Sequence, residues 1–338
     1  MEKKDILSTP ISHIDMTGFD ARQLVKSMED MSFTSREIAC AVDILSMMLR
    51  DDECTIILTI AGSAGAAGCL KIYSDMIKYN MVDAVVATGA SIVDMDFFEA
   101  LGFRHYQGTP HIDDNVLREL SVDRIYDTYI DEEELQVCDS TIRKIADGLS
   151  PGVYSSREFI REMGRYLVST SAEKESLVQL AYEHHVPIFC PAFSDSSAGF
   201  GLVKHQWDNP DRHVSIDSVK DFRELTMIKM KALGTGLFMV GGGVPKNFAQ
   251  DTVVCAEFLG EDVPMHKYAV QITVADVRDG ACSGSTLKEA LSWGKVSGHF
   301  EQMVYAEATS VLPLILSAVY HEKLWQKRDR RKWATLFS

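Results

Sequence analysis

The chain of 338 residues contains five short apolar runs, separated by segments long enough to form helices. The first run, Cys54 to Ile60, is rich in β-branched residues and too short for a helix of its own, so it predicts a buried parallel strand. The same pattern recurs at Val82 to Thr88, Val186 to Phe193, Gly236 to Val240 and Tyr268 to Val274. Strands that alternate with helices predict an α/β fold with a mostly parallel sheet flanked by helices.

Segments of helical length surround these runs. Gly68 to Tyr79 and Ser215 to Leu233 lie between predicted strands. Before the first strand, the chain through Leu49 also has a helical pattern, with one amphipathic stretch that opens at Asp20-Ala21-Arg22. The next stretch opens at Thr34-Ser35-Arg36-Glu37, which we interpret as a helix cap because a Thr followed three residues later by Glu can satisfy free backbone N–H groups.

We expect a single domain over residues 1–338, with a helical N-terminal segment (1–50), an α/β core (51–320) and a C-terminal tail (321–338). The core contains a more polar excursion at about residues 103–169, which is predicted to be helical and packed on the sheet. The tail holds one basic block, Lys323 to Lys332. Terminal charge runs are usually solvated, so we expect this block to form a solvated helix or a frayed tail.

The composition narrows the classes of partner. The formal net charge is -15, which disfavours nucleic acid as the main partner because phosphate binding needs a basic surface. The chain has no run of eighteen apolar residues and no signal-peptide pattern at its start, so we expect a cytoplasmic protein with no membrane partner. The seven cysteines include no CxxC pair, and the sequence therefore predicts neither a metal site nor a disulfide framework.

Small, hydroxyl and acidic residues follow the predicted strands, at the edge of the sheet where ligands bind in such folds. The loop Gly62 to Gly68 leads into a helix, and its lack of side chains lets a backbone approach a pyrophosphate. Its spacing is GxxGxxG and not GxGxxG, and tight packing of a strand on a helix would also select small residues. Comparable residues follow the later strands at Gly89 to Asp96, Ser194 to Gly199 and Gly241 to Pro245. Together these loops predict a cleft for a nucleotide cofactor and a polar ligand.

A lysine follows an aromatic residue in Ser292-Trp293-Gly294-Lys295, beyond the fifth predicted strand. An ammonium beside apolar surface tends to lose its proton, and a neutral amine can attack a carbonyl or imine carbon. A helix from about Thr286 would place Glu289 and Trp293 on one face, where a carboxylate and an indole could hold an alkyl-ammonium chain. A packed tryptophan, a turn glycine and a solvated lysine are the alternative.

Seven motifs follow one another along the chain. They are GxxxxxG (Gly62 to Gly68), VDxxVxT (Val82 to Thr88), HxPxFxPAxxDxSxG (His185 to Gly199), GGGVxK (Gly241 to Lys246), DGxxSG (Asp279 to Gly284), EAxSWGK (Glu289 to Lys295) and YAxAxxxxP (Tyr305 to Pro313). In this order the chain resembles deoxyhypusine synthase and its homologues, and EAxSWGK with GGGVxK upstream is highly specific.

The resemblance implies a Rossmann-like, NAD-binding fold and a homotetrameric aminobutyl transferase with active sites at subunit interfaces. In that chemistry NAD takes a hydride from spermidine, the resulting imine loses diaminopropane, and a lysine holds the butylamine fragment as an imine. The fragment then passes to an acceptor amine, which can be a protein lysine. Lys295 matches the imine-forming lysine, Trp293 the aromatic wall along the polyamine, and Glu289 a carboxylate that meets one of its ammonium groups. The matching cofactor positions are Gly62, Ser63, Thr88, Asp195, Gly242, Ala275 and Ala308, with Asp279 and Ser283 nearby and Glu307 where the family usually has aspartate.

The chain departs from the family on the polyamine side. Val93-Asp94 stands where the family has two glutamates, so Asp94 is the carboxylate that remains for the substrate. The other replacements are Phe200 and Cys282 at aspartate positions, Asn247 at a histidine position and Gln271 at a tyrosine position. Each lost carboxylate removes a charge-assisted contact worth roughly 1.5 to 3 kcal/mol, and asparagine cannot replace histidine as an acid or base.

We therefore predict a deoxyhypusine synthase-like transferase of alkyl groups other than methyl, which acts on an altered polyamine or related amine. A small-molecule acceptor, as in homospermidine-forming relatives, suits the smaller number of negative groups. Authentic deoxyhypusine synthesis and a non-catalytic, NAD-binding structural or regulatory role remain the alternatives. A deacylase of the sirtuin type is disfavoured because the chain has no paired CxxC zinc ligands.

Overall fold

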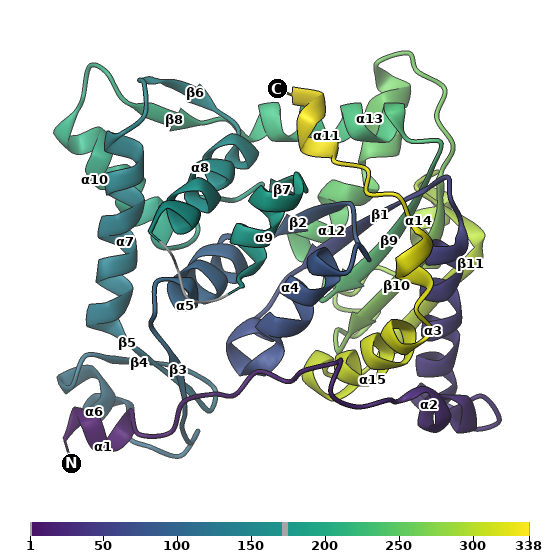
Figure 1. Ribbon diagram of the computed structural model, residues 1–338, viewed down its shortest axis with the longest axis horizontal. Coiled ribbons are helices and arrows are strands. Elements are labelled where there is room, and N and C mark those ends of the chain that lie inside the picture. The colour runs from purple at the N-terminus through teal and green to yellow at the C-terminus, as the bar shows by residue number, and fades with distance from the viewer. Residues whose placement is uncertain (1, 171–174, 338) are drawn as a thin grey trace.

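The computed structural model describes residues 2–170 and 175–337, and a six-stranded sheet forms its centre (Figure 1). The strands lie in the order β11-β10-β9-β1-β2-β7, and every pairing between them is parallel. Their bounds are β1 (Cys54–Ile60), β2 (Ala84–Ala87), β7 (Ile188–Phe189), β9 (Gly234–Val240), β10 (His266–Thr273) and β11 (Val296–Tyr305). The predicted α/β fold, with a mostly parallel sheet flanked by helices, is confirmed.

Five of these strands fall on the predicted apolar runs, and one does not. The strand β1 has the predicted bounds, whereas β7 is only two residues long, because Pro187 and Pro191 near its ends cannot donate ladder hydrogen bonds. The strand β11 was not predicted. It lies at the edge of the sheet with most of its residues partly or fully exposed, so it has no continuous apolar run.

Helices cover both faces of the sheet. Ile56 and Leu58 of β1 join the core beneath α3, α4 and α15, while Ile57 between them joins the core beneath α11, α12 and α14, as the alternation of a strand requires. The helices are α3 (Thr34–Arg50), α4 (Leu70–Lys78) and α15 (Ala308–His321) on one face, and α11 (Ser218–Lys231), α12 (Gly243–Gln250), α13 (Thr252–Phe258) and α14 (Leu287–Ser292) on the other. Within the described ranges, no helix combines the length and the apolar character that a membrane span needs.

The chain between β2 and β9 adds a second group of helices, at the left in Figure 1. These are α5 (Phe98–Ala100), α6 (Asp114–Glu119), α7 (Glu132–Asp147), α8 (Ser156–Ser169), α9 (Leu177–His184) and α10 (Ser197–Asp208). Two small sheets accompany them, one with the order β3-β5-β4 (His105–Gln107, Thr128–Asp131, Val122–Ile125) and one that pairs β6 (Gly152–Tyr154) with β8 (Val214–Ile216). Residues 103–169 were predicted to be helical, but they also contain short strands. The prediction missed these strands because three or four residues are too few to show a clear period in the sequence.

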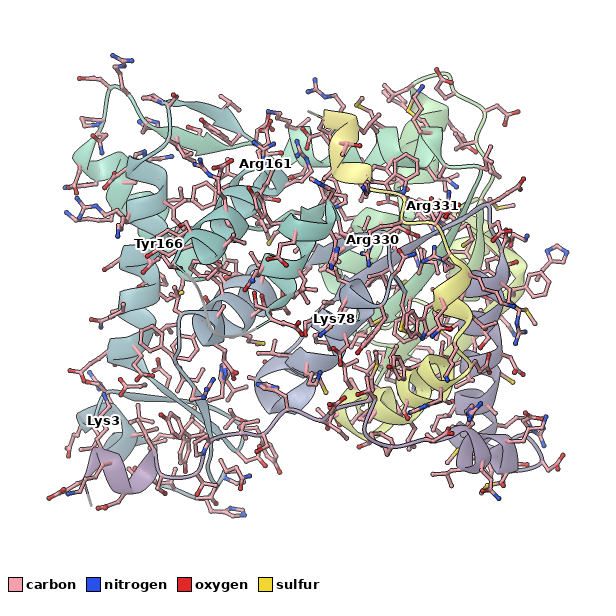
Figure 2. All side chains as sticks on the ribbon, viewed as in Figure 1. Lys3, Lys78, Arg161, Tyr166, Arg330 and Arg331 are labelled. Atoms are coloured by element: carbon pink, nitrogen blue, oxygen red, sulfur yellow. The ribbon has the colours of Figure 1, made fainter. Side chains whose placement is uncertain are left out.

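The N-terminal segment forms α1 (Lys3–Ile6), α2 (Arg22–Met28) and α3. The helix α3 begins at Thr34 as predicted, but the proposed cap is wrong. Phe33 occupies the capping position, and the Thr34 hydroxyl donates instead to the Tyr305 carbonyl (3.4 Å). Far from this helix, Lys3 (labelled in Figure 2) donates to the Asp131 carboxylate at 2.6 Å and fastens α1 to the start of α7.

The basic C-terminal block is solvated only in part. Its lysines, Lys323, Lys327 and Lys332, are exposed as predicted, whereas its arginines are half-buried and make specific contacts. The Arg328 guanidinium is buried, where it donates to the Asp83 carboxylate (2.7 Å) and the Asn80 carbonyl (2.6 Å). Arg330, labelled with Lys78 in Figure 2, donates to the carbonyls of Ile77 (2.9 Å) and Lys78 (3.0 Å). The block thus supplies donors to free carbonyls at the end of α4 and to a buried carboxylate at the start of β2. The short 3₁₀ turn η3 (Leu324–Lys327) lies within the block, and η4 (Trp333–Phe337) follows it.

Candidate active site

Lys295 lies in the tight turn that joins α14 to β11. Gly294 adopts a φ of 71°, which glycine reaches without strain, and the Lys295 N–H donates to the Ala290 carbonyl (3.0 Å). The Lys295 carbonyl accepts from the His266 N–H (2.9 Å), so the lysine stands level with the first residue of β10. From the sequence we expected this lysine to lie beyond the last strand. It lies instead at the amino edge of the sheet, because the unpredicted strand β11 follows it.

The Lys295 side chain lines a cavity of about 670 Å³ between α12, α13, α14 and the loop before α14. Its Nζ lies 2.5 Å from Oδ1 of Asp251 and 3.4 Å from Oδ1 of Asn247. The same atom lies 5.0 Å from the centre of the Trp293 ring, within the range of a cation–π contact. The side chain is 11% exposed. Most of the remaining wall is apolar and comes from Phe222, Val254, Cys255, Phe258, Ala281 and Ala290.

Glu289 and Trp293 line the same cavity from α14 and its end. The Glu289 carboxylate accepts from the Thr286 N–H (2.5 Å) and from the Thr286 hydroxyl (2.8 Å), which forms a capping box at the start of the helix. The backbone hydrogen bond from Thr286 and then the hydroxyl hydrogen bond lower the pKa of Glu289 below its ordinary value. The carboxylate is therefore ionised at neutral pH, fixed in place and exposed to a cation that enters.

Residues 282–285, which we call the wall segment, separate this cavity from a second pocket. Cys282 and Ser285 line the cavity, whereas Ser283 lines the second pocket. The buried Lys246 amine holds the segment by donating to the carbonyls of Cys282 (3.1 Å) and Ser285 and to the Ser285 hydroxyl (2.9 Å). Burial lowers the pKa of Lys246 to about 8. Buried Gln271 donates to the Ser283 carbonyl at 3.2 Å from the other side, so both flanks of the segment are fastened.

The second pocket, of about 310 Å³, lies at the carboxyl ends of β1, β9, β10 and β11, and we call it the glycine pocket. Seven residues predicted to bind a cofactor line it: Gly62, Ser63, Gly242, Ala275, Ser283, Glu307 and Ala308. Gly241 has a φ of 75°, and a Cβ there would lie 2.7 Å from the Ala61 carbonyl oxygen. At Gly242 a Cβ would lie 2.4 Å from Cα of Ser283. Both positions require glycine because neighbouring backbone leaves no room for a side chain.

Glu307 begins α15 as its capping residue. Its carboxylate accepts from the Thr309 N–H (3.0 Å), the Ser310 N–H (3.2 Å) and the Thr309 hydroxyl. Burial by itself would raise the pKa of Glu307, but the hydrogen bonds from Thr309 and Ser310 outweigh it and the pKa is lowered. The glycine pocket therefore has an ionised carboxylate at a helix start, with lone pairs that can accept from the hydroxyl groups of a sugar.

Three other residues predicted to bind the cofactor line neither cavity. The Thr88 hydroxyl contacts the Ser91 hydroxyl (2.8 Å), which donates to the Gly62 carbonyl (3.3 Å), so Thr88 adjoins the glycine pocket through one side chain. Asp195 is exposed on the loop after β7, along the same edge of the sheet. Asp279 is exposed on the loop before the wall segment.

Asp94 and Phe200, both on the predicted polyamine side, do not line the Lys295 cavity within one chain. The Asp94 carboxylate accepts from the Ser197 N–H (2.8 Å) at the start of α10, and burial raises its pKa to about 6. Phe200 is 71% exposed on α10, where it lies beside Trp207 along a shallow apolar pocket. A single chain thus assembles the lysine, its aromatic neighbour and the glycine pocket, but it does not bring Asp94 to them.

Two charged residues at the site were missed from the sequence. Asp251, which pairs with Lys295, lies one helical turn beyond Asn247, and that spacing of four residues was the signal that could have found it. Lys246 was noted as part of a motif but was given no role. Its function as the anchor of the wall segment depends on contacts with residues 36 and 39 positions away, which no local pattern encodes.

The family model and the most similar sequences indicate the same family. A model of the deoxyhypusine synthase family matches residues 23–319. The chain is 67% identical to a deoxyhypusine synthase-like protein of Coxiella burnetii, over 99% of this chain and 96% of that protein. It is 62% identical to a protein of the same description from Caulobacter vibrioides, over 99% of this chain and 93% of that protein.

A crystal structure from Entamoeba histolytica, assigned as a deoxyhypusine synthase, resembles this structure with a TM-score of 0.62 at 20% identity. The match covers 95% of this chain and 99% of that chain, and it concerns the fold. The chain belongs to the deoxyhypusine synthase family, a family of transferases.

Proposed function

We propose that this protein is an NAD-dependent aminoalkyl transferase that carries an aminobutyl or related fragment of a polyamine or related amine as an imine on Lys295. The position of the Lys295 amine is the observation on which this proposal rests. The amine lies against the Trp293 ring in a cavity large enough for an alkylamine, and the wall segment lines both that cavity and the glycine pocket. Neighbouring spaces for a nucleophilic amine and for a hydride acceptor suit a reaction that needs both.

The residues of the glycine pocket fit a dinucleotide. Gly241 and Gly242 keep the backbone bare where strands β1 and β9 end, and a Cβ at Gly62 would project into open space. The Glu307 carboxylate suits ribose hydroxyls. We infer that these residues hold NAD in a Rossmann-like manner, with Thr88 and Asp195 further along the edge. The bound cofactor would accept a hydride from the carbon beside the amine nitrogen.

The cavity that the Lys295 side chain lines, which we call the amine cavity, supports the expectation of an altered substrate. Among its described lining residues, the carboxylates are those of Asp251 and Glu289, and Asp251 is already paired with Lys295. Asn247 and Cys282 add no negative charge, and the other walls are mostly apolar. A cavity of this kind favours an amine with few ammonium groups, since each unpaired ammonium in an apolar space costs free energy.

The proposal includes a homotetramer in the cytoplasm. At the rim of the amine cavity, Phe258 is 89% exposed and Trp293 is 70% exposed, with Val254 beside them. Clusters of exposed apolar side chains mark surfaces that another chain covers. In the proposed assembly a second copy of this chain closes the rim and excludes water from the imine.

The test is to trap the fragment on its lysine. Purified protein is incubated with NAD and one amine from a panel of putrescine, spermidine, agmatine and homospermidine, then reduced with borohydride and digested. We expect a mass increase on the peptide that contains Lys295, with reduced cofactor formed in the same reaction. Lys295→Ala should abolish the adduct, whereas Lys288→Ala, which removes an exposed lysine of α14, should leave it unchanged.

One outcome would decide against the transferase itself, and a second would decide against the altered substrate. Tight NAD binding without an adduct from any amine would favour the non-catalytic alternative, which the ion pair of Lys295 with Asp251 also suits, because a paired ammonium is not a nucleophile. An adduct that passes to a protein lysine, and not to a free amine, would favour authentic deoxyhypusine synthesis.

A further inference from the structure

The Lys295 amine has one close charged partner among the described residues, the Asp251 carboxylate. The separation of 2.5 Å between Nζ and Oδ1 allows a proton to pass directly between them without a bridging water. The aspartate belongs to the turn between α12 and α13, its side chain is 30% exposed, and it lines the amine cavity. It can therefore contact both the lysine and a bound ligand.

Asn247 fixes the orientation of this carboxylate. Its Nδ2 donates to Oδ2 of Asp251 at 2.8 Å, which leaves Oδ1 turned to Lys295. Its own Oδ1 lies 3.4 Å from the lysine nitrogen. The amide thus touches both members of the pair, and because it does not titrate, it holds them in either protonation state.

Four other titratable groups lie around the pair. They are Lys246 of α12, Cys255 of α13, Cys282 of the wall segment and Glu289 of α14. Lys246 donates to the wall segment, and the Glu289 carboxylate accepts from Thr286. Asp251 is therefore the group placed to exchange protons with Lys295.

Building on the proposed function, we propose that Asp251 shuttles protons between the Lys295 nitrogen and the amine that leaves, and that Asn247 is a positioning residue for it. The reactants are the Lys295 ammonium and the protonated imine of the oxidised substrate. One proton passes to Asp251, and the freed lone pair forms a bond to the imine carbon. A second proton leaves the lysine nitrogen before the old C–N bond breaks, and both protons finish on the departing nitrogen as its ammonium. Lys295 keeps the fragment as a protonated imine, and no electron is gained or lost in this exchange.

The test separates oxidation of the amine from its transfer. Wild-type protein and Asp251→Asn are mixed with NAD and the amine that labels the wild type, and both the reduced cofactor and the borohydride-trapped adduct are followed over time. Asparagine keeps the shape of aspartate but cannot take up a proton. We expect the rate of adduct formation to fall about a hundredfold or more, with little change in formation of the reduced cofactor.

Two further variants exclude a purely structural effect. Formate or acetate added to Asp251→Gly should restore part of the adduct rate, because a small carboxylate can occupy the vacated space and accept the proton. Asn247→Ala should slow adduct formation by a smaller factor and change its pH profile, because it leaves the carboxylate in place but unoriented. Thermal melts of each variant show whether the fold persists.

The outcomes are distinct. An unchanged adduct rate in Asp251→Asn would overturn the role. A faster rate would also overturn it and would mean that the ion pair keeps Lys295 unreactive. Equal losses of cofactor reduction and adduct formation, with no rescue by carboxylates, would also overturn it. A wild-type protein that forms no adduct contradicts the proposed function itself, and this role with it.

Discussion

The buried Lys229 should make the stability of this protein depend on pH. The side chain lies in α11 with no exposed surface, and its amine donates to the Thr235 hydroxyl at 2.7 Å. That hydroxyl contacts Nδ1 of His266 (2.8 Å), whose Nε2 contacts the Ala249 carbonyl (3.2 Å). Burial lowers the pKa of Lys229 from 10.5 to about 8. The chain of polar groups therefore ends on an amine that is costly to charge.

The magnitude follows from this difference. Each tenfold change in a protonation equilibrium is worth about 1.4 kcal/mol, so holding Lys229 protonated in the fold at pH 7 costs about 3 kcal/mol. Between about pH 8 and pH 10.5 the unfolded chain binds a proton that the folded chain does not, so the free energy of unfolding rises with pH. Lys229→Met keeps an unbranched apolar chain and removes the titration.

We expect Lys229→Met to increase the free energy of unfolding by about 2 kcal/mol at pH 7, since the lost hydrogen bond to Thr235 offsets about 1 kcal/mol of the gain. At pH 10 most of this advantage should be gone. The measurement is urea denaturation of both proteins at one protein concentration and a series of pH values. Lys231→Met, in the same helix but exposed, is the matched control and should show no pH-dependent difference. A difference between wild type and Lys229→Met that stays constant from pH 7 to pH 10 would refute the reasoning.

Two other substitutions test the wall segment and the C-terminal block. Lys246→Met leaves the Ser285 carbonyl without its lysine donor, which costs about 1 to 3 kcal/mol. NAD and the amine should therefore each bind about tenfold more weakly when measured by calorimetry. The control Lys288→Met should bind both ligands as tightly as the wild type does. Arg328→Met leaves the Asp83 carboxylate buried without its cation and should lower the free energy of unfolding by about 3 kcal/mol in urea denaturation. Exposed Lys327→Met is its control, and an equal effect of the two would contradict a role for the buried ion pair.

Much of the fold follows from local patterns, because a central parallel strand must be apolar on both faces. The run Cys54 to Ile60 became β1 with the predicted bounds. The strand β11 escaped prediction because an edge strand has only one neighbour and tolerates polar residues. The basic block at the C-terminus predicted a solvated Arg328. The structure pairs this arginine with Asp83, which lies 245 positions away along the chain, so no local charge pattern could indicate the contact.

The sequence alone determined the family, the parallel core and the lysine with its aromatic neighbour, because these depend on residue types and their order along the chain. The tertiary structure decided that Lys295 stands at the amino edge of the sheet with Asp251 at 2.5 Å, and that the wall segment separates its cavity from the glycine pocket. It also decided that Asp94 lies away from that cavity within one chain. Hydrogen bonds and ion pairs act over a few ångströms of space, and only folding determines which distant residues come within that range.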